Sequence, residues 1–475
     1  MFIEHLEKII TLLNDFLWSK LLVYVLVLLG IYFTLRTRFV QIRNIGEMIR
    51  LMGDGIGASV KGKKGVSSFQ AFCISTASRV GVGNLAGVAM AISLGGPGAV
   101  FWMWLIAILG SASAFVESTL AQIYKVKDKD VYRGGPAYYM QKGLNARWMG
   151  IIFAILITFC FGLVFNSVQA NTLTLAFNTA FHIDRVYVGI AITILLAVII
   201  FGGVKRIAKA AELTVPFMAV AYILVALYII IMNYDKIPTV FTLIIKNAFG
   251  LEAAFGGGVG AAILQGIKRG LFSNEAGMGS APNAAATAEV THPVKQGFIQ
   301  ALSVFTDTLL VCSATALIIL FSGNQLDSKL EGIQLTQNAL ATQMGAWAPG
   351  FVTIAILFFA FTSLIGNYYY GETNIEFIKE SKGWLFVYRV AVIVMVLWGS
   401  MAKVQLVWDL ADLFMALMAI TNLIAITLLG RVAFAALKDY LEQRKQGKDP
   451  VFYASRIKGL ENVECWKDEK EENIG

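Results

Sequence analysis

Long apolar runs separated by short polar segments make up most of the chain. Since about 20 apolar residues cross a bilayer as a helix, each run predicts one membrane span. The runs cover residues 21–35, 99–124, 148–179, 186–204, 213–232, 296–321, 350–370, 384–401 and 406–436. Two further segments of membrane length carry helix-breaking residues. The pattern therefore predicts an all-α polytopic membrane protein with about eleven spans.

The first interrupted segment covers residues 66–94 and is centred on residues 77–84. Gly81 and Gly83, each costing a helix roughly 1 kcal/mol relative to Ala, lie there beside Arg79 and Asn84. Backbone groups left without hydrogen bonds are costly in lipid, so a break survives only where it lines a cavity. Close packing of small residues against another helix is the alternative explanation.

The second interrupted segment covers residues 252–289. It holds eight glycines together with Lys268, Arg269, Asn274 and Glu275, ahead of Pro282. No lipid-facing helix has this composition. We expect a half-helix over residues 253–271, a break at 272–277 and a second half-helix to about residue 289.

The two interrupted segments occupy matching positions once the first apolar run is set aside as an extra N-terminal helix, residues 1–35. They are then the first and the sixth of ten spans. Paired broken helices in two halves indicate an inverted-repeat transporter with its site at mid-membrane. The predicted repeats are residues 66–232 and 252–436, followed by a charged cytoplasmic tail, residues 437–475.

Composition and charge narrow the function. The chain has 57% hydrophobic and 15% charged residues and a net charge of +8. Most basic residues fall in alternate loops, which predicts an outside N-terminus and a cytoplasmic C-terminus in the cell (inner) membrane. The basic loops explain the positive net charge, so no nucleic-acid partner is expected. The four cysteines are scattered, and no catalytic, metal or nucleotide motif is present, so neither an enzyme nor a cofactor is expected.

Several motifs resemble the alanine/glycine:cation symporter family (sodium:alanine symporters). They are Phe69-Gln70-Ala71-Phe72, Arg79-Val80-Gly81-Val82-Gly83-Asn84, Leu94-Gly95-Gly96-Pro97-Gly98-Ala99-Val100-Phe101-Trp102-Met103-Trp104, Gly134-Gly135-Pro136-Ala137-Tyr138-Tyr139 and Arg269-Gly270-Leu271-Phe272-Ser273-Asn274-Glu275-Ala276-Gly277-Met278-Gly279-Ser280-Ala281-Pro282. The resemblance implies a leucine-transporter-type fold of five plus five helices. It also implies coupling to sodium, or to protons in some relatives, and small neutral amino acids as substrates.

Ends of half-helices can neutralise a zwitterion and its companion ion. The amides of Val82 and Gly83, at the positive end of a half-helix, are expected to bind the substrate carboxylate. The carbonyls of Ala77 and Val80 are expected to bind Na⁺. By resemblance, the hydroxyls of Thr362 and Ser363 complete that sodium site. The alternative is that these hydroxyls bond to carbonyls of their own helix.

Other polar residues are predicted around the substrate. By resemblance, Gln169 contacts it, with Asn166 as a wall one turn away. Phe272 and Asn274 lie at the second break, where backbone carbonyls would receive the ammonium group and the Phe272 ring would cap the substrate side chain. Asn84 is a weaker candidate for binding a second ion, and an interhelical hydrogen bond is the alternative role for Gln169.

Departures from the family pattern bear on specificity and coupling. Asn367 stands where many members carry Trp, four residues after Ser363, which predicts room for a larger polar substrate such as glutamine. Arg79 stands beside the expected sodium carbonyls, and a buried ion pair with Glu117 or Glu275 would explain it.

Three functional hypotheses remain open from the sequence. A sodium:amino-acid symporter is favoured. A proton-coupled symporter would use an acidic residue such as Glu117, Glu275 or Asp307. A channel or a membrane-embedded enzyme is the third. Besides the amino acid, the ion and the lipid bilayer no partner is required; a monomer suffices, and the sequence does not fix the oligomeric state.

Overall fold

The computed structural model describes residues 2–58, 66–128, 131–201, 217, 220–250, 258–323, 330 and 332–466. In this part the chain is almost entirely helical, as predicted. One antiparallel pair of short strands, β1 (Val126–Asp128) and β2 (Val131–Arg133), follows helix α7 (Ala99–Ile123).

The helices before residue 201 are α1 (Phe2–Asn14), α2 (Val23–Arg36), α3 (Val40–Arg43), α4 (Ile45–Ala58), α5 (Ser68–Arg79), α6 (Val88–Gly95), α7 (Ala99–Ile123), α8 (Pro136–Gly143), α9 (Arg147–Ile157), α10 (Asn166–Phe181) and α11 (Arg185–Ile200). Those after it include α13 (Ile237–Ala248), α14 (Gly258–Asn274), α15 (Ala281–Ala285), α16 (Pro293–Val304), α17 (Ser313–Ser322), α18 (Ile333–Met344), α19 (Ala348–Ile378), α20 (Lys382–Met401) and α21 (Val404–Lys445). π-Helical turns cover Asp15–Leu22, Gly83–Gly87, Thr158–Phe165 and Phe305–Cys312, and short 3-10 helices cover Tyr234–Lys236 and Ala454–Arg456.

Seven helices of the described residues are long and apolar enough to cross a membrane, or up to nine if each bent pair counts as one span. The first runs from Glu7 to Arg36, so the N-terminal helix is longer than its apolar core. The predicted count of eleven and the inverted repeat remain predictions. Residues 202–216, which hold one predicted loop and the start of the span at 213–232, lie outside the described residues.

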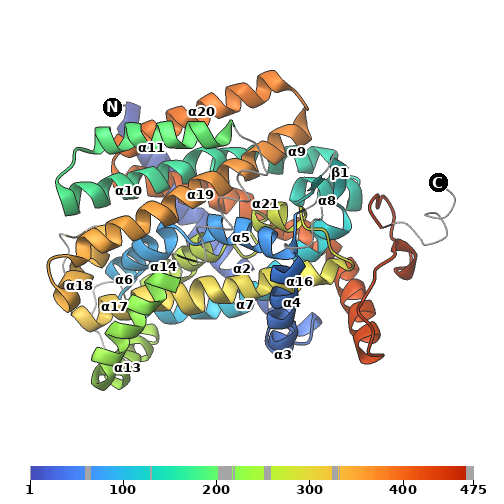
Figure 1. The fold of residues 1–475 in the computed structure, drawn as a ribbon, viewed down its shortest axis with the longest axis horizontal. Helices are drawn as coiled ribbons and strands as arrows, with labels where there is room; N and C mark the ends of the chain where they lie inside the picture. Colours follow the sequence, from blue (N-terminus) through green and yellow to red (C-terminus); the bar gives the residue numbers. More distant parts are fainter. Residues whose placement is uncertain are drawn as a thin grey trace.

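The broken helices lie inside the bundle (Figure 1). α7 packs against α14 and α16, α10 packs against α19 and α20, and α5 packs against α19. Figure 1 shows α5, α6 and α14 among these long helices, with α13 and α18 at one end and α8 and β1 at the other. The residues at the two breaks, 79–87 and 275–280, are therefore buried among the other helices.

The C-terminal region is more ordered than its charge predicts. α21 continues nine residues past the predicted boundary at 436, to Lys445. The chain then folds back, and Trp466, only 7% exposed, donates a hydrogen bond from its indole to the carbonyl of Gln122 at 2.9 Å. The Lys125 ammonium lies over the Trp466 ring, and burial lowers the pKa of Lys125 to about 7. No periodic pattern indicates this packing, because it depends on two aromatic residues, Phe452 and Trp466, in a polar stretch.

Candidate functional site

The first break begins within its predicted range, residues 77–84. Ser67 and Gln70 form a capping box that starts α5, and such boxes satisfy the free amides of a helix start. The helix ends at Arg79, because Val80 turns to an extended conformation with φ −78° and ψ 90°. The two halves, Ser68–Arg79 and Gly83–Gly95, meet at an angle of 49°.

Side chains meet the amides freed by this break. The side-chain oxygen of Asn84 accepts a hydrogen bond from the Gly81 amide at 2.8 Å, and that of Gln169 accepts one from the Val82 amide at 3.1 Å. An amide oxygen thus lies on Val82 where the substrate carboxylate is expected. Gly83 instead packs against the second break, since a Cβ there would lie 3.0 Å from a ring atom of Phe272.

The second break overlaps its predicted range of 272–277 but begins and ends later, between α14 and α15. Phe272, Ser273 and Asn274 are still helical, because the Glu275 amide donates to the Leu271 carbonyl at 2.9 Å. The chain leaves the helix at Glu275, which has a positive φ of 56°. The following half is not a helix to residue 289 but the single short helix α15.

Glu117 on α7 satisfies the backbone of this second break. Its two carboxylate oxygens accept hydrogen bonds from the amides of Gly277 and Gly279, each at 3.1 Å. The Asn422 side chain donates to the same carboxylate at 2.8 Å and to the Gly277 carbonyl at 2.9 Å. Asn274 accepts from the Ala276 amide at 3.0 Å. A buried carboxylate here takes the place of the capping residue that a helix end needs.

The two breaks contact each other. The hydroxyl of Ser78 on α5 lies 2.8 Å from the Glu275 carboxylate and 2.8 Å from the side-chain oxygen of Asn367. The Asn84 side chain donates to the Ser273 hydroxyl at 3.0 Å. Both broken helices therefore meet at one polar region with α19.

The expected sodium ligands divide into two groups. The Ser363 hydroxyl donates to the Ala77 carbonyl at 2.9 Å and to the Phe359 carbonyl at 3.0 Å, so α19 reaches the end of α5. The Thr362 hydroxyl bonds only within its own helix, to Phe358 and Phe359 at 2.9 and 3.0 Å. Ser363 thus lies at the carbonyl end of the first half-helix, whereas the bonds of Thr362 follow the alternative considered from the sequence.

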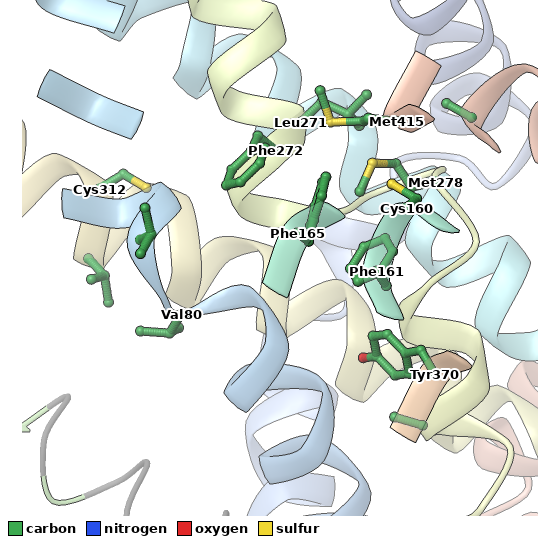
Figure 2. Packing of buried hydrophobic residues seen from close by; sticks show 14 of the residues in the cluster. Val80, Cys160, Phe161, Phe165, Leu271, Phe272, Met278, Cys312, Tyr370 and Met415 are labelled. Carbon is green, nitrogen blue, oxygen red and sulfur yellow. The ribbon is translucent and has the colours of Figure 1, made fainter. Parts of the chain in front are cut away.

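One of the expected substrate residues, Phe272, belongs to a row of aromatic side chains. Figure 2 shows Phe272, Phe165, Phe161 and Tyr370 side by side, and it shows Val80 at the bend of the first broken helix. The Phe272 ring lies 4.5 Å from Phe165 and 4.7 Å from the Trp408 ring, between centroids. Sequence reasoning missed Trp408, because only the tertiary structure brings α21 to this place.

The predicted site residues are all buried. They are Ala77, Val80, Val82, Gly83, Asn84, Asn166, Gln169, Phe272, Asn274, Thr362, Ser363 and Asn367. Asn166 bonds back to the Gly162 carbonyl at 3.0 Å, and its side-chain oxygen has no partner in the described part of the chain.

Arg79 does not form the expected ion pair. Its guanidinium approaches the carbonyl and the side-chain oxygen of Gln300, both at 3.4 Å, and no carboxylate of the described residues lies within the 4.0 Å of an ion pair. Glu117 and Glu275 have other donors, namely backbone amides, Asn422, Ser78 and Ser280. Both carboxylates therefore accept hydrogen bonds from groups at the two breaks, whereas Arg79 approaches only Gln300 on α16.

Asp307 forms a further polar cluster that joins both breaks to a third helix. Its carboxylate accepts hydrogen bonds from Asn84 at 2.7 Å, and from Ser273 and Thr308 at 2.8 Å each. Asp307 is 1% exposed. A buried carboxylate bonded only to neutral donors is suited to receive a cation.

Comparisons with known proteins agree with the motifs. A model of the sodium:alanine symporter family matches residues 3–454. The probable sodium/glutamine symporter GlnT of Bacillus subtilis is 60% identical over 98% of this chain and 96% of its own length. The amino-acid carrier protein AlsT of the same species is 58% identical over 98% and 99%. The sodium/alanine symporter AgcS of Methanococcus maripaludis is 38% identical over 92% and 98%. These relatives are named as carriers and symporters, not enzymes.

The fold has a more distant likeness among solved structures. A mutant of the Eremococcus coleocola manganese transporter superposes with a TM-score of 0.50 at 14% identity, covering 80% of this chain and 81% of that one. At this identity the likeness concerns the fold alone. It agrees with the all-helical fold described above.

Proposed function

Since the chain belongs to the sodium:alanine symporter family, we propose that it couples Na⁺ influx to the uptake of a small neutral amino acid by alternating access. The observation that supports this most is the meeting of two broken helices at Ser78 and Glu275. We further propose the five-plus-five inverted repeat, about eleven spans and an outside N-terminus. One Na⁺ moving down 100 mV supplies about 2.3 kcal/mol, and a tenfold gradient adds about 1.4 kcal/mol.

The proposed substrate site lies at the start of the second half of the first broken helix. The substrate carboxylate replaces the side-chain oxygen of Gln169 on the Val82 amide, and Gln169 then turns to the substrate. The Phe272 ring covers the substrate side chain, and backbone carbonyls at the second break, near Asn274, receive the substrate ammonium group. Asn166 forms the wall.

The proposed sodium site uses the carbonyls of Ala77 and Val80 and the hydroxyl of Ser363. We expect Ser363→Ala to raise the Na⁺ concentration for half-maximal uptake about tenfold, equivalent to about 1.4 kcal/mol, because the hydroxyl that reaches the Ala77 carbonyl is lost. Thr362→Val, the control, should change it less than threefold. Sodium titration of alanine uptake in proteoliposomes measures both. An equal or larger effect of Thr362→Val would assign the site to Thr362.

Glutamine is proposed as a substrate alongside alanine and glycine. Asn367 is small, buried and bonded to Ser78, and a relative named as a probable sodium/glutamine symporter is 60% identical. Asn367→Trp should fill the room that we expect beside Asn367 for a larger substrate. Glutamine competition against alanine uptake should then fall at least tenfold, while glycine still competes. Asn367→Ala is the control, and it should keep glutamine competition within threefold. Absence of glutamine competition in the unmodified protein would disprove the specificity.

Proton coupling is the second candidate function, and the polar cluster around Asp307 supports it. Asp307 is buried among neutral donors, and a Bacillus relative, 42% identical, is named as a sodium/proton-dependent alanine carrier. Proton coupling predicts uptake driven by an imposed pH gradient in sodium-free buffer, and Asp307→Asn should abolish that uptake. Sodium coupling predicts uptake only with Na⁺.

The test of the proposed function is uptake of labelled alanine, glycine and glutamine into proteoliposomes holding the full chain. Accumulation against a concentration gradient, dependent on an inward Na⁺ gradient, is expected. Accumulation that collapses with a sodium ionophore distinguishes coupling from facilitated diffusion. Conductance without saturation, or chemical turnover of the substrate, would instead support a channel or an enzyme.

A further inference from the structure

A basic pocket of about 630 Å³ lies between the end of α2 and the last turns of α21. Six cationic side chains line it: Arg36, Arg38, Arg43, Lys438, Arg444 and Lys445. None of them belongs to the proposed transport site. Glu442 is the one acidic residue among its lining residues, so the pocket has a strong excess of positive charge.

Most of this charge has no acidic partner. Arg444 lies 3.2 Å from Glu47, and Lys438 lies 3.8 Å from Glu442. The other four cations have no carboxylate within 4.0 Å among the residues that the structure describes. Because like charges repel at close range, such a group favours binding of an anion.

The backbone gathers the three arginines. Arg38 and Phe39 have positive φ angles of 54° and 58°, a conformation that is unfavourable for residues other than glycine. The Phe39 amide donates to the Thr34 carbonyl at 2.8 Å, which closes the end of α2. Arg43 donates back to the Arg38 carbonyl at 3.2 Å. Strained backbone of this kind is frequently found at binding sites.

The position of the pocket relative to the membrane follows from the exposed residues that precede it on α2 and α21. On α2, Leu28 and Leu35 are 65% and 58% exposed, and on α21 Ile424 and Leu428 are 51% and 61% exposed. Exposed apolar residues on membrane helices face lipid chains. Both helices change from apolar to basic within the next few turns, so the pocket lies at the level of the lipid headgroups.

The helix that follows supports this placement. Phe39, Ile42, Ile45 and Ile49 are between 37% and 59% exposed and lie on α3, α4 and the turn before them. An amphipathic helix with an exposed apolar face and nearby cations lies in the membrane interface. The exposed isoleucines therefore place this segment against lipid on the same level.

The remaining wall is apolar and selects the ligand. Phe434, Leu437 and Leu441 line the pocket beside the cations, and the Arg36 guanidinium lies 5.3 Å from the centre of the Phe434 ring. A free phosphate would leave this wall unused, whereas a phospholipid fills it with the first carbons of an acyl chain. We propose that the pocket binds the headgroup of an acidic phospholipid, whose phosphate lies among the arginines and which links the N-terminal helix to α21.

Native mass spectrometry of the full chain in detergent tests this proposal. Phosphatidylglycerol is expected to bind at least tenfold more tightly than phosphatidylcholine, and added salt should weaken its binding. The triple variant Arg36→Gln, Arg38→Gln, Arg43→Gln should lose about tenfold in phosphatidylglycerol affinity. A matched triple variant elsewhere, Lys379→Gln, Lys382→Gln, Lys458→Gln, removes the same charge from exposed positions and should stay within twofold.

Two results would overturn the proposal. One is an unchanged phosphatidylglycerol affinity in the arginine triple variant. The other is displacement of the lipid by an equal concentration of glycerol 3-phosphate, which would make the pocket a site for soluble phosphates. If the triple variant does not fold, Arg38→Gln with Lys445→Gln changes two exposed residues without acidic partners and should lower the affinity at least threefold, with no change counting against the lipid.

Discussion

A single methyl group at position 81, introduced as Gly81→Ala, is expected to reduce sodium-driven amino-acid uptake about a hundredfold or more. The new Cβ would lie 2.3 Å from the Ser363 hydroxyl oxygen and 3.0 Å from the side-chain oxygen of Gln169. Both groups must move, and they are the ones that bond to the Ala77 carbonyl and the Val82 amide. Displacement of binding groups by about 1 Å can cost a hundredfold, and here the proposed ion and substrate ligands are displaced together.

Gly87→Ala is the matched control for this variant. It lies in the same broken helix, but a Cβ there would meet the Trp408 ring at 3.6 Å, an ordinary contact. Initial rates of alanine uptake, with thermal unfolding of both purified variants, separate transport from folding. Uptake by Gly81→Ala within threefold of the unmodified chain, at normal stability, would show that the site lies elsewhere.

The positions of the two breaks could be predicted to different degrees. The first break depends on local features, namely the capping box of Ser67 and Gln70 and the glycines at 81 and 83, so its predicted range of 77–84 includes the observed end of α5. The second break begins at Glu275, inside its predicted range of 272–277, but extends past that range to Ser280. Its backbone is held by Glu117, which is more than 150 residues away in the chain, and no local pattern carries that information.

The same reason explains the residues that were assigned other roles. The sequence favours an ion pair of Arg79 with Glu117 or Glu275, because opposite charges in apolar spans usually pair. The freed amides of the second break provide donors that a linear pattern does not display, and the carboxylates bind those. Trp408 was overlooked for a similar reason, since an aromatic residue in an apolar span is indistinguishable from packing until its neighbour Phe272 is known.

A buried charge cluster next to this aromatic pair gives the second large expectation. Asp412 on α21 lies 2.7 Å from both the Lys268 ammonium and the Arg269 guanidinium of α14. Asp412 is fully buried, and Arg269 is 2% exposed. The Arg269 guanidinium also lies 4.7 Å from the centre of the Trp408 ring, which packs on Phe272. One carboxylate therefore pairs with two cations, which leaves the cluster with a net charge of +1, and Trp408 connects it to Phe272.

Asp412→Asn is expected to lower the free energy of unfolding by about 3 to 5 kcal/mol, because it leaves two buried cations without a counter-charge. Asp409→Asn is the control, since it removes the same charge one turn earlier, where the carboxylate is half-exposed and bonds to Gln405. Denaturant unfolding in detergent, followed by tryptophan fluorescence, gives both values.

The double variant Arg269→Gln, Asp412→Asn distinguishes loss of the counter-charge from loss of packing. Removing one cation together with the carboxylate leaves only Lys268 charged, so the double variant should recover at least 1 kcal/mol relative to Asp412→Asn, a coupling within the range found for contacting residues. Additive losses would mean that the cluster stabilises α14 and α21 through shape alone. Recovery would mean that the net charge of the cluster determines how tightly α14 and α21 pack together. Through Trp408, the same contact would determine the position of Phe272 over the substrate.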